Sequence, residues 1–502
     1  MQRRLIAKLT RKCKNAKSHS IDEPDSWDPE RVLLRWSQDA AWTVGDSYTG
    51  TICLGSTGSA KSTGTVAMMA AAMLEAGYGM LCLTVKPEDR QNYIDLARSR
   101  GRLADVMVFS PDHLLRYNFI ADEMAHAASP LGLVENLTAL IMTIAEVGDR
   151  GQSAASSGGE ARFFDLAANQ LCRNGLCVNV LSGDPVTVPT LHKLIVSAPQ
   201  SLEAVQSGAW RETEFGRLLQ LADRAGKTES VRADFDLVLT YFLREWPALS
   251  PRTRSVVQTT LTTVTDQLSR GAARDLLSAP APNFSFDALD EGKVIIVDFP
   301  VLVYRDIARV IQVAAKFMAQ RHLARRTGPS RPVAIVADEA QLLMVEEDQR
   351  FQAIARSTRT AVLYATQSIS GLIDALGPNA EDRVHALLTN LQTQVCHQQT
   401  DPRTVRYFQE LVGRSRQIMA SGNQSQGEGW LAPLFGQDTG ASYGFGEVYE
   451  HELQASDFNT LARGGPPRWM TEAIVYQGGR RFANGRTWLK ARIRQEVPNA
   501  PR

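Results

Sequence analysis

The stretch TICLGSTGSAKST, residues 51–63, decides the fold class of this chain. Thr51–Leu54 is a short apolar run, the loop that follows is rich in glycine and small polar residues, and the Ala- and Met-rich residues 64–74 are typical of a helix. Gly77 and Gly79 end that helix, and residues 80–85 form a second apolar run. A strand, a loop, a helix and another strand in this order predict a parallel sheet covered by helices.

The loop itself matches the phosphate-binding pattern G-x-x-x-x-G-K-[ST], with Ala60 in place of the second glycine. Backbone N–H groups of such a loop, together with the N-terminus of the next helix, surround the β- and γ-phosphates of a nucleotide. Lys61 would neutralise these phosphates, and the Ser62 hydroxyl would bind Mg²⁺. Ala60 adds a methyl group where glycine's freedom is useful, which could weaken binding or slow turnover. The residues predicted to bind nucleotide are Gly55, Ser56, Thr57, Gly58, Ser59, Ala60, Lys61, Ser62 and Thr63.

A later apolar run, Val333–Ala337, ends in the adjacent carboxylates Asp338 and Glu339. Beside a phosphate loop, Asp338 would hold Mg²⁺ through water, and Glu339 would act as general base on the attacking water. An acidic strand end that merely faces solvent is the alternative. With both halves present, we expect the chain to bind ATP or GTP with Mg²⁺.

Residues 361–365 form a further apolar run, followed by Thr366, Gln367 and Ser368. Because the carboxyl ends of parallel strands face the ligand, Gln367 would contact the γ-phosphate or the attacking water. The alternative is a simple helix start with Ser368 as its cap. Arg356 and Arg359 precede this run, and either could reach the site of a neighbouring subunit; we take Arg359 as the candidate catalytic arginine.

The chain divides into four parts by composition and by the spacing of its apolar residues. Residues 1–30 are a basic and then acidic flexible tail, and residues 31–120 are the first part of the nucleotide-binding domain. Residues 121–275, with apolar positions three and four apart, predict an all-helical insertion. Residues 276–502 are the second part of the nucleotide-binding domain, with a mobile Gly/Gln/Ser-rich excursion over residues 415–445.

Bulk composition limits the class of protein. The 502 residues are 44 % hydrophobic and 22 % charged, which are ordinary globular values. No apolar run approaches the ~20 residues that cross a bilayer, and the six scattered cysteines indicate reduced thiols in a cytosol. The net charge of +1 argues against an open basic surface that coats DNA. It is compatible with a ring whose pore carries a few basic residues per subunit.

The order of motifs resembles the TraG/TraD family of type IV coupling proteins, within the wider class of HerA- and FtsK-like motors. The matching stretches are GSTGSAKST, RYNFIAD (116–122), NFSFDALDEGKVIIVDFP, IVADEAQLL and ARSTRTAVLYATQS. The resemblance implies a RecA-like domain with a mostly parallel sheet and an inserted all-α domain. It also implies a homo-hexameric ring and ATP hydrolysis coupled to translocation of DNA, single-stranded or bound to a relaxase, at a secretion channel.

Three features depart from the family pattern. Its members usually begin with transmembrane helices, whereas this sequence shows no apolar run of that length. We therefore expect a cytoplasmic protein that reaches the inner membrane through a partner protein or its basic tail. Ala60 replaces the loop glycine. The stretch Thr84–Glu88 also lacks the aspartate of an Asp-x-Lys-like turn, so Lys86 is left out of the predicted site.

Two other functions stay open at this point. The first is a nucleotide-regulated docking or scaffold protein with weak or no turnover, motivated by Ala60. The second is a HerA-like motor that works in DNA processing or defence. Candidate DNA-contacting residues are Arg252, Arg254, Arg270 and Arg274, and a basic group near the C-terminus.

Overall fold

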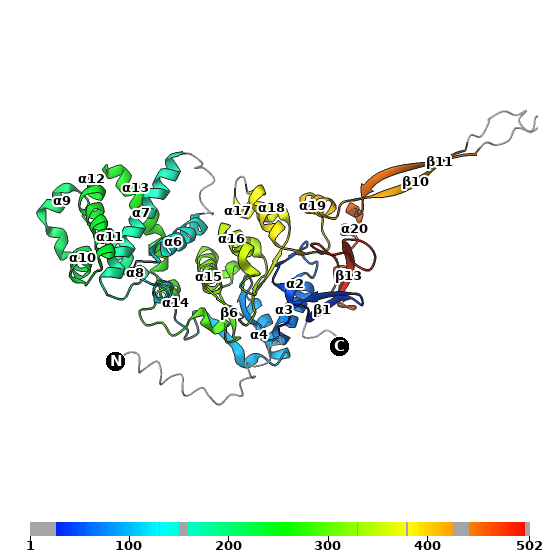
Figure 1. The fold of residues 1–502 in the computed structure, drawn as a ribbon, viewed down its shortest axis with the longest axis horizontal. Coiled ribbons are helices and arrows are strands. Elements are labelled where there is room, and N and C mark those ends of the chain that lie inside the picture. The colour runs from blue at the N-terminus through cyan, green and yellow to red at the C-terminus, as the bar shows by residue number, and fades with distance from the viewer. Residues whose placement is uncertain are drawn as a thin grey trace, which may run out of the picture.

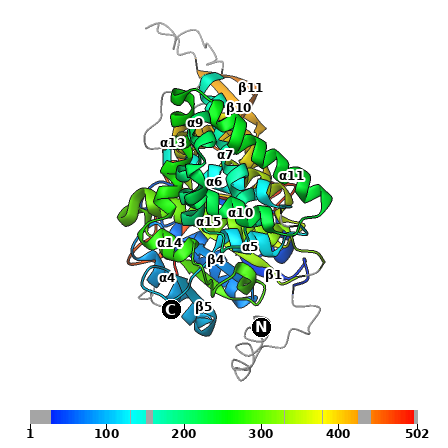
Figure 2. The same ribbon diagram turned by 90° about the vertical axis from the view of Figure 1, so that its left-hand side faces the viewer.

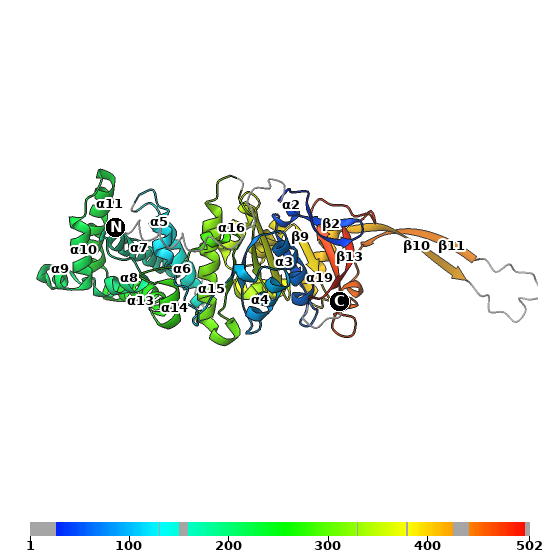
Figure 3. The same ribbon diagram turned by 90° about the horizontal axis from the view of Figure 1, so that it is seen from below.

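The structure of the protein is a computed structural model. It describes residues 27–129, 131–149, 159–328, 330–377, 380–424 and 441–496. The molecule is elongated, with a helical part at one end, a large sheet in the middle and a two-stranded ribbon at the other end (Figures 1 and 3). Most of the predicted tail, the 151–158 loop and residues 425–440 lie outside the described residues.

In the described part of the chain, the central sheet has nine strands in the order β13-β12-β9-β3-β8-β7-β4-β6-β5. The strands from β9 to β5 are parallel, and β12 and β13 extend the sheet as an antiparallel edge. Their bounds are β3 Thr51–Leu54, β4 Gly79–Leu83, β5 Val106–Phe109, β6 Val294–Val297, β7 Val333–Ala337, β8 Thr360–Thr366, β9 Thr393–Cys396, β12 Met470–Gln477 and β13 Trp488–Arg494. This confirms the predicted mostly parallel α/β sheet.

Both faces of the sheet are buried, because alternate residues of each strand enter different hydrophobic cores. In β4, Met80 and Cys82 pack in the core that contains α3 (Ala67–Glu75). Leu81 and Leu83 pack in the core that contains α15 (Val301–Ala324). The strands therefore read as continuous apolar runs, and this is what made β3 and β7 predictable from the sequence.

Between β5 and β6 the described elements are helices, and they form the part of the molecule farthest from the ribbon (Figures 1 and 2). They are α5 Phe119–Ala125, α6 Val134–Asp149, α7 Gly159–Leu181, α8 Val188–Ser197, α9 Leu202–Ser207, α10 Glu214–Arg224, α11 Glu229–Thr240, α12 Trp246–Ala248, α13 Pro251–Leu268 and α14 Gly271–Leu277. Buried Glu123 of α5 pairs with Arg321 of α15 and with Arg325 directly after it, which ties this part to the sheet.

Several elements differ from the sequence expectations. The chain is packed from Trp27, whose indole N–H donates to the Ala76 carbonyl, so the last residues of the expected tail belong to the body. α15, which the sequence analysis did not delimit, begins at Val301 and is kinked at Arg305. The 415–445 excursion overlaps a ribbon of β10 (Arg414–Gln424) and β11 (Ala441–His451), which the sequence did not predict.

The remaining elements surround these layers. They are β1 Val32–Ser37, β2 Ala40–Thr43, α2 Val44–Ser47, α4 Asp89–Ser99, α16 Glu346–Ala355, α17 Ile369–Leu376, α18 Glu381–Asn390, α19 Pro402–Val412 and α20 Ala455–Asn459. No helix within the described ranges is long and apolar enough to cross a membrane.

Candidate nucleotide site

The phosphate loop joins β3 to a π-helical turn, Ser62–Val66, that continues into α3. A side chain at Gly55 would come within 2.5 Å of Ser59 Oγ and 2.8 Å of His397 Cβ, so the loop has no room for one there. Gly58 has φ 77° and Ala60 has φ 61°. Ala60 thus adopts the left-handed conformation that glycine would adopt freely, at a cost of about 1–2 kcal/mol for a residue with a Cβ.

The two predicted halves of the site meet at the carboxyl edge of the sheet. Lys61, at the helix start, places its Nζ 3.4 Å from Glu339 Oε1. The Ser62 hydroxyl donates to Asp338 Oδ2 at 2.6 Å. Lys61, Asp338 and Glu339 are all buried. The structure therefore brings together the cation, the hydroxyl and both carboxylates that the sequence pattern indicated.

Glu339 is held by its neighbours in a defined position. Its backbone is left-handed at φ 50°. Its Oε2 accepts hydrogen bonds from Gln341 at 2.8 Å and from Gln367 at 3.3 Å. Burial raises the pKa of Glu339, but Lys61, the Gln341 hydrogen bond and Lys86 outweigh it, so this pKa lies below its ordinary value. Glu339 is thus a carboxylate at neutral pH and can accept a proton.

Gln367 lies where the sequence placed it, beyond the end of β8, with its amide directed at Glu339. Its backbone carbonyl accepts a hydrogen bond from Gln399 at 2.8 Å. Gln399 in turn accepts from the Ser56 hydroxyl of the phosphate loop at 3.2 Å. The side chain of Gln399 therefore connects Gln367 to the phosphate loop. The sequence analysis did not identify Gln399.

Lys86 belongs to the site, although the sequence analysis left it out. Its Nζ lies 3.7 Å from Asp338 Oδ2 and 3.8 Å from Glu339 Oε1. Burial lowers the pKa of Lys86, but these two carboxylates outweigh it and raise this pKa above its ordinary value. Asp89 fixes the turn by accepting from the backbone N–H groups of Val85 and Lys86. An aspartate three residues after Lys86 thus holds the turn in place. The lack of an aspartate before Lys86 was therefore a wrong reason to leave Lys86 out of the predicted site.

The phosphate loop rests on a buried polar layer behind it. His397 follows β9 and its Nε2 lies 2.8 Å from Thr65 Oγ1, while its Nδ1 lies 3.3 Å from Thr471 Oγ1. Thr471 donates to the Ser59 carbonyl of the loop at 3.0 Å. Burial, together with the nearby Lys61 charge, lowers the pKa of His397 to about 3. A neutral imidazole therefore supports the loop.

Arg359 lies at the opposite edge of the sheet from Lys61. It directly precedes β8, and its guanidinium contacts the Ser330 carbonyl at 3.4 Å. Seven residues of strand separate it from Gln367, which is roughly 23 Å at 3.3 Å per residue. Arg359 therefore takes no part in the site of its own chain.

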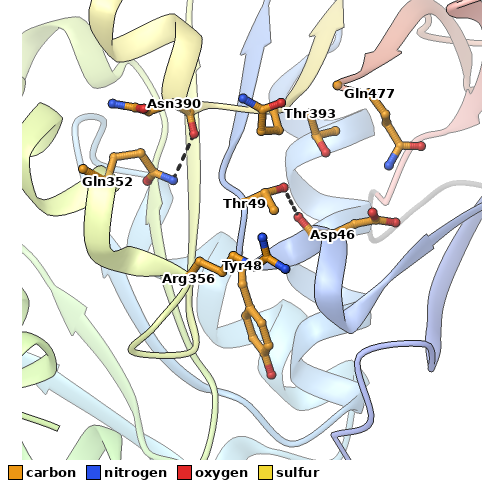
Figure 4. Close-up of a pocket in the computed structure, with 11 residues that line it drawn as sticks. Asp46, Tyr48, Thr49, Gln352, Arg356, Asn390, Thr393 and Gln477 are labelled. Atoms are coloured by element: carbon orange, nitrogen blue, oxygen red, sulfur yellow. Dashed lines mark hydrogen bonds between the residues drawn. The ribbon is translucent and has the colours of Figure 1, made fainter. Parts of the chain in front are cut away.

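Arg356 lines a polar cavity of about 430 Å³ at this same amino edge. Figure 4 shows it reaching from beyond α16 toward Asp46, with Gln352 and Asn390 also around the cavity. Arg356 is exposed, and its guanidinium makes no hydrogen bond or ion pair with the part of the chain that the structure describes. Arg356 is thus free to contact another molecule, whereas Arg359 is not.

Of the candidate DNA contacts in the helical part, Arg252, Arg270 and Arg274 are exposed, and Arg254 is not. Arg254 is buried and donates to the carbonyls of Pro247 and Leu249. Arg270 pairs with Asp266, and Arg274 pairs with Asp275. These contacts favour a structural role for Arg254.

The residues at the carboxyl edge fit a nucleotide with Mg²⁺. Ser62 and Asp338 present two oxygen atoms close together, and oxygen is the ligand that Mg²⁺ prefers. Lys61 and Lys86 supply two ammonium groups for phosphate oxygens. The loop and the start of the helix supply backbone N–H groups in the arrangement that binds phosphates.

Comparison with known proteins agrees with this geometry. Residues 332–447 match the family model described as the TraM recognition site of TraD and TraG. The resemblance to the TraG/TraD proteins is confirmed. No curated protein matches the chain.

The fold is shared with solved structures of a coupling protein, TrwB. The trigonal form of the bacterial conjugative coupling protein TrwBΔN70 with sulfate is 13 % identical and has a TM-score of 0.59, covering 95 % of this chain and 91 % of that chain. The plasmid coupling protein TrwB in complex with ADP and Mg²⁺ is 14 % identical, with a TM-score of 0.59 and coverage of 94 % and 91 %. At these identities the likeness establishes the fold, a RecA-like sheet with a helical part.

Proposed function

We propose that this TraG/TraD-like protein is a P-loop ATPase that couples hydrolysis of Mg²⁺-bound ATP to the translocation of DNA. The observation that carries the proposal is the meeting of Lys61, Ser62, Asp338, Glu339 and Gln367 at one edge of the sheet. The TraG/TraD-like segment and the TrwB-like fold support the choice of a DNA-handling motor over other ATPases.

The proposed chemistry assigns one role to each side chain. Lys61 and Lys86 neutralise the phosphate oxygens, and Ser62 and Asp338 hold Mg²⁺, which supplies further positive charge to the β- and γ-phosphates. Glu339 accepts the proton of the attacking water through the oxygen that Gln341 and Gln367 also contact. Gln367 then senses the γ-phosphate, because its amide can contact either that group or Glu339.

The active assembly in this proposal is a homo-hexameric ring. A head-to-tail ring brings two different surfaces of neighbouring copies together. Of the two candidate arginines, Arg356 suits a role in the neighbour's site better than Arg359, because it is exposed and unpaired while Arg359 contacts the Ser330 carbonyl. Further partners in this proposal are single-stranded or relaxase-bound DNA and secretion-channel proteins, with a cytoplasmic location at the inner membrane.

The test is ATP hydrolysis with and without single-stranded and double-stranded DNA. We expect DNA to stimulate hydrolysis, and we expect Lys61→Ala and Glu339→Gln to reduce it at least about 100-fold, as loss of a general base does. Glu339→Gln should still bind ATP, since it removes the base and keeps the shape. Nucleotide binding without turnover under any DNA condition contradicts the motor.

A second candidate function is a nucleotide-regulated docking or scaffold protein. The observation that favours it is the left-handed backbone of Ala60, which strains the loop that must hold the phosphates during turnover. It predicts ATP binding that changes association with a partner while hydrolysis stays negligible. A HerA-like motor in DNA processing or defence shares the ATPase test and differs in its partners.

A further inference from the structure

Residues 302–305, which we call the exposed turn, lie at the start of α15, just beyond the carboxyl end of β6. Leu302 is 64 % exposed, Val303 55 % and Tyr304 46 %. A run of large apolar side chains at the surface is a liability in a soluble protein unless another molecule contacts it. The Tyr304 ring also packs against buried Phe299, with the ring centroids 5.7 Å apart, so the tyrosine is anchored while part of it stays accessible.

Two arginines accompany these side chains. Arg305 and Arg309 are four residues apart on α15, and within the described ranges neither side chain makes a hydrogen bond or an ion pair. Asp306 carries a single negative charge between them, so the start of the helix is positive overall. Arg305 also has φ 53° and ψ −126°, a strained backbone for a residue with a Cβ, and such strain is concentrated at sites that contact ligands.

An exposed aromatic ring beside unpaired guanidinium groups suits single-stranded DNA. The ring and the guanidinium plane stack on unpaired bases, and the guanidinium also pairs with phosphate oxygens. In a duplex the base faces are covered by their neighbours, so the same ring would find no face to stack on.

We infer that the exposed turn contacts single-stranded DNA through Tyr304 and Arg305, and that this contact regulates the nucleotide site through Lys86. The inference rests on the proposed function, because it names the form of DNA and the route by which DNA acts on that site. Both ends of the route lie at the carboxyl edge of the sheet, since β6 and β4 are parallel neighbours.

The first link of the route is a backbone hydrogen bond. The Leu302 N–H donates to the Val85 carbonyl at 3.2 Å. Val85 directly precedes Lys86, whose ammonium group lies within 4 Å of both carboxylates of the candidate site. A displacement of the exposed turn is therefore passed to the residue that faces Asp338 and Glu339.

The second link is Gln312, a fully buried side chain two turns farther along α15. Its Nε2 donates to the carbonyls of Thr84 and Val297, at 2.8 Å each. Thr84 follows β4 and leads into the Lys86 turn, and Val297 ends β6. Gln312 thus makes α15 move together with the ends of both strands.

Binding of fluorescein-labelled oligo(dT), followed by fluorescence anisotropy, tests the contact. We expect Tyr304→Ala and Arg305→Ala each to weaken oligo(dT) binding about tenfold, as loss of one stacking partner does, and to leave binding of a blunt duplex unaffected. The matched control is Tyr449→Ala, which removes a tyrosine that is 66 % exposed on the ribbon and should bind oligo(dT) like the unmodified chain.

The route is tested by Gln312→Leu. We expect this variant to bind oligo(dT) like the unmodified chain while oligo(dT) no longer stimulates its ATP hydrolysis. Gln320→Leu is the matched control, because Gln320 is a buried glutamine of the same helix that donates to Asp348 instead, and its stimulation should persist. If Gln312→Leu does not fold, Tyr304→Ala at saturating oligo(dT) replaces it, and stimulation equal to that of the unmodified chain overturns the route.

Cross-linking of the unmodified chain to oligo(dT) that carries 5-iodouracil needs no variant. A cross-link in residues 300–309 supports the inference, and cross-links confined to other peptides overturn it. Unchanged oligo(dT) affinity in both Tyr304→Ala and Arg305→Ala also overturns it, and if self-association weakens instead, the exposed turn is a contact between copies. An unmodified chain that hydrolyses ATP but neither binds nor responds to any DNA contradicts the proposed motor itself, which is a different outcome.

Discussion

Ala60 is the residue at which the phosphate loop departs from the G-x-x-x-x-G-K-[ST] pattern, and its backbone adopts a strained left-handed conformation. With φ at 61°, replacement by glycine removes about 1–2 kcal/mol of strain, partly offset by about 0.4–1 kcal/mol of added freedom in the unfolded chain. We therefore expect Ala60→Gly to raise the free energy of unfolding by up to about 1 kcal/mol, measured by denaturant titration.

The matched control for this prediction is Ala67→Gly, at the start of α3 after the loop. Ala67 has an ordinary helical backbone, so glycine there should lower stability by roughly 0.5–1 kcal/mol. A loss of stability in both variants would show that contact of the Ala60 methyl group with the Gly464 region outweighs the strain.

His397 gives the loop a predictable dependence on pH. Its pKa is about 3 in the folded chain against an ordinary 6.5, so the unfolded chain binds more protons between these values. The stability that neutral His397 contributes is complete above pH 6.5 and is lost as pH falls toward 3.

We expect the melting temperature to fall between pH 7 and pH 5, and to fall less in His397→Gln. The matched control is His126→Gln, which removes a histidine that is exposed at the end of α5 and lies outside the loop and its support. Identical profiles for all three proteins would mean that the histidine charges without disturbing the loop.

Chemical pattern alone identified the residues that would act directly on a nucleotide in the proposed function. Lys61, Ser62, Asp338, Glu339 and Gln367 each follow or begin an element with a strong apolar pattern, so the sequence indicated where they would meet. Lys86, His397 and Gln399 have no such pattern. Lys86 is positioned by Asp89, three residues later, and His397 by a strand that is itself weakly marked.

At the scale of elements, burial on both faces decides what the sequence reveals. β3 and β7 are continuous apolar runs and were predicted at their observed bounds. β9 reads Thr-Gln-Val-Cys, so it lacks a continuous apolar run, and the Gln394 side-chain amide N–H group donates to the Leu388 and Leu391 carbonyls. Within the described residues, β10 and β11 pair only with each other and do not join the central sheet, so the apolar pattern of that sheet does not extend to them.

A buried ion pair joins three elements behind the site. Lys316 of α15 pairs with Asp348 of α16, and both side chains are essentially inaccessible to solvent. Asp348 also accepts from Gln320 at 2.9 Å and from the Tyr364 hydroxyl of β8 at 3.0 Å. The network therefore fixes α15, α16 and β8 relative to one another, and β8 carries Gln367 at its end.

Removal of one partner should be costly, because it leaves an uncompensated buried charge. We expect Lys316→Met to lower the free energy of unfolding by about 3–5 kcal/mol, and the double change Lys316→Met with Asp348→Leu to recover a large part of this loss. Circular dichroism during denaturation measures both. A double variant no more stable than Lys316→Met would mean that the hydrogen bonds of Asp348, not its charge, hold the elements.

At the scale of the molecule, the candidate nucleotide site lies at one edge of the sheet, while Arg356 is exposed and unpaired at the other. If the protein works as a ring, one copy must supply Arg356 to the phosphates of its neighbour. We expect Arg356→Ala to reduce DNA-stimulated hydrolysis about 1,000-fold or more, as loss of such an arginine does, without weakening ATP binding. Arg359→Ala, the matched control, should retain most of the activity.

Mixing experiments separate action across subunits from action within one. Lys61→Ala copies lack a working loop but present Arg356, and Arg356→Ala copies have the loop but lack the arginine. In an equal mixture, about a quarter of the sites combine an intact loop with a neighbour's arginine, so activity should return although each variant alone is inactive. A mixture as inactive as its components would place Arg356 outside the neighbour's site.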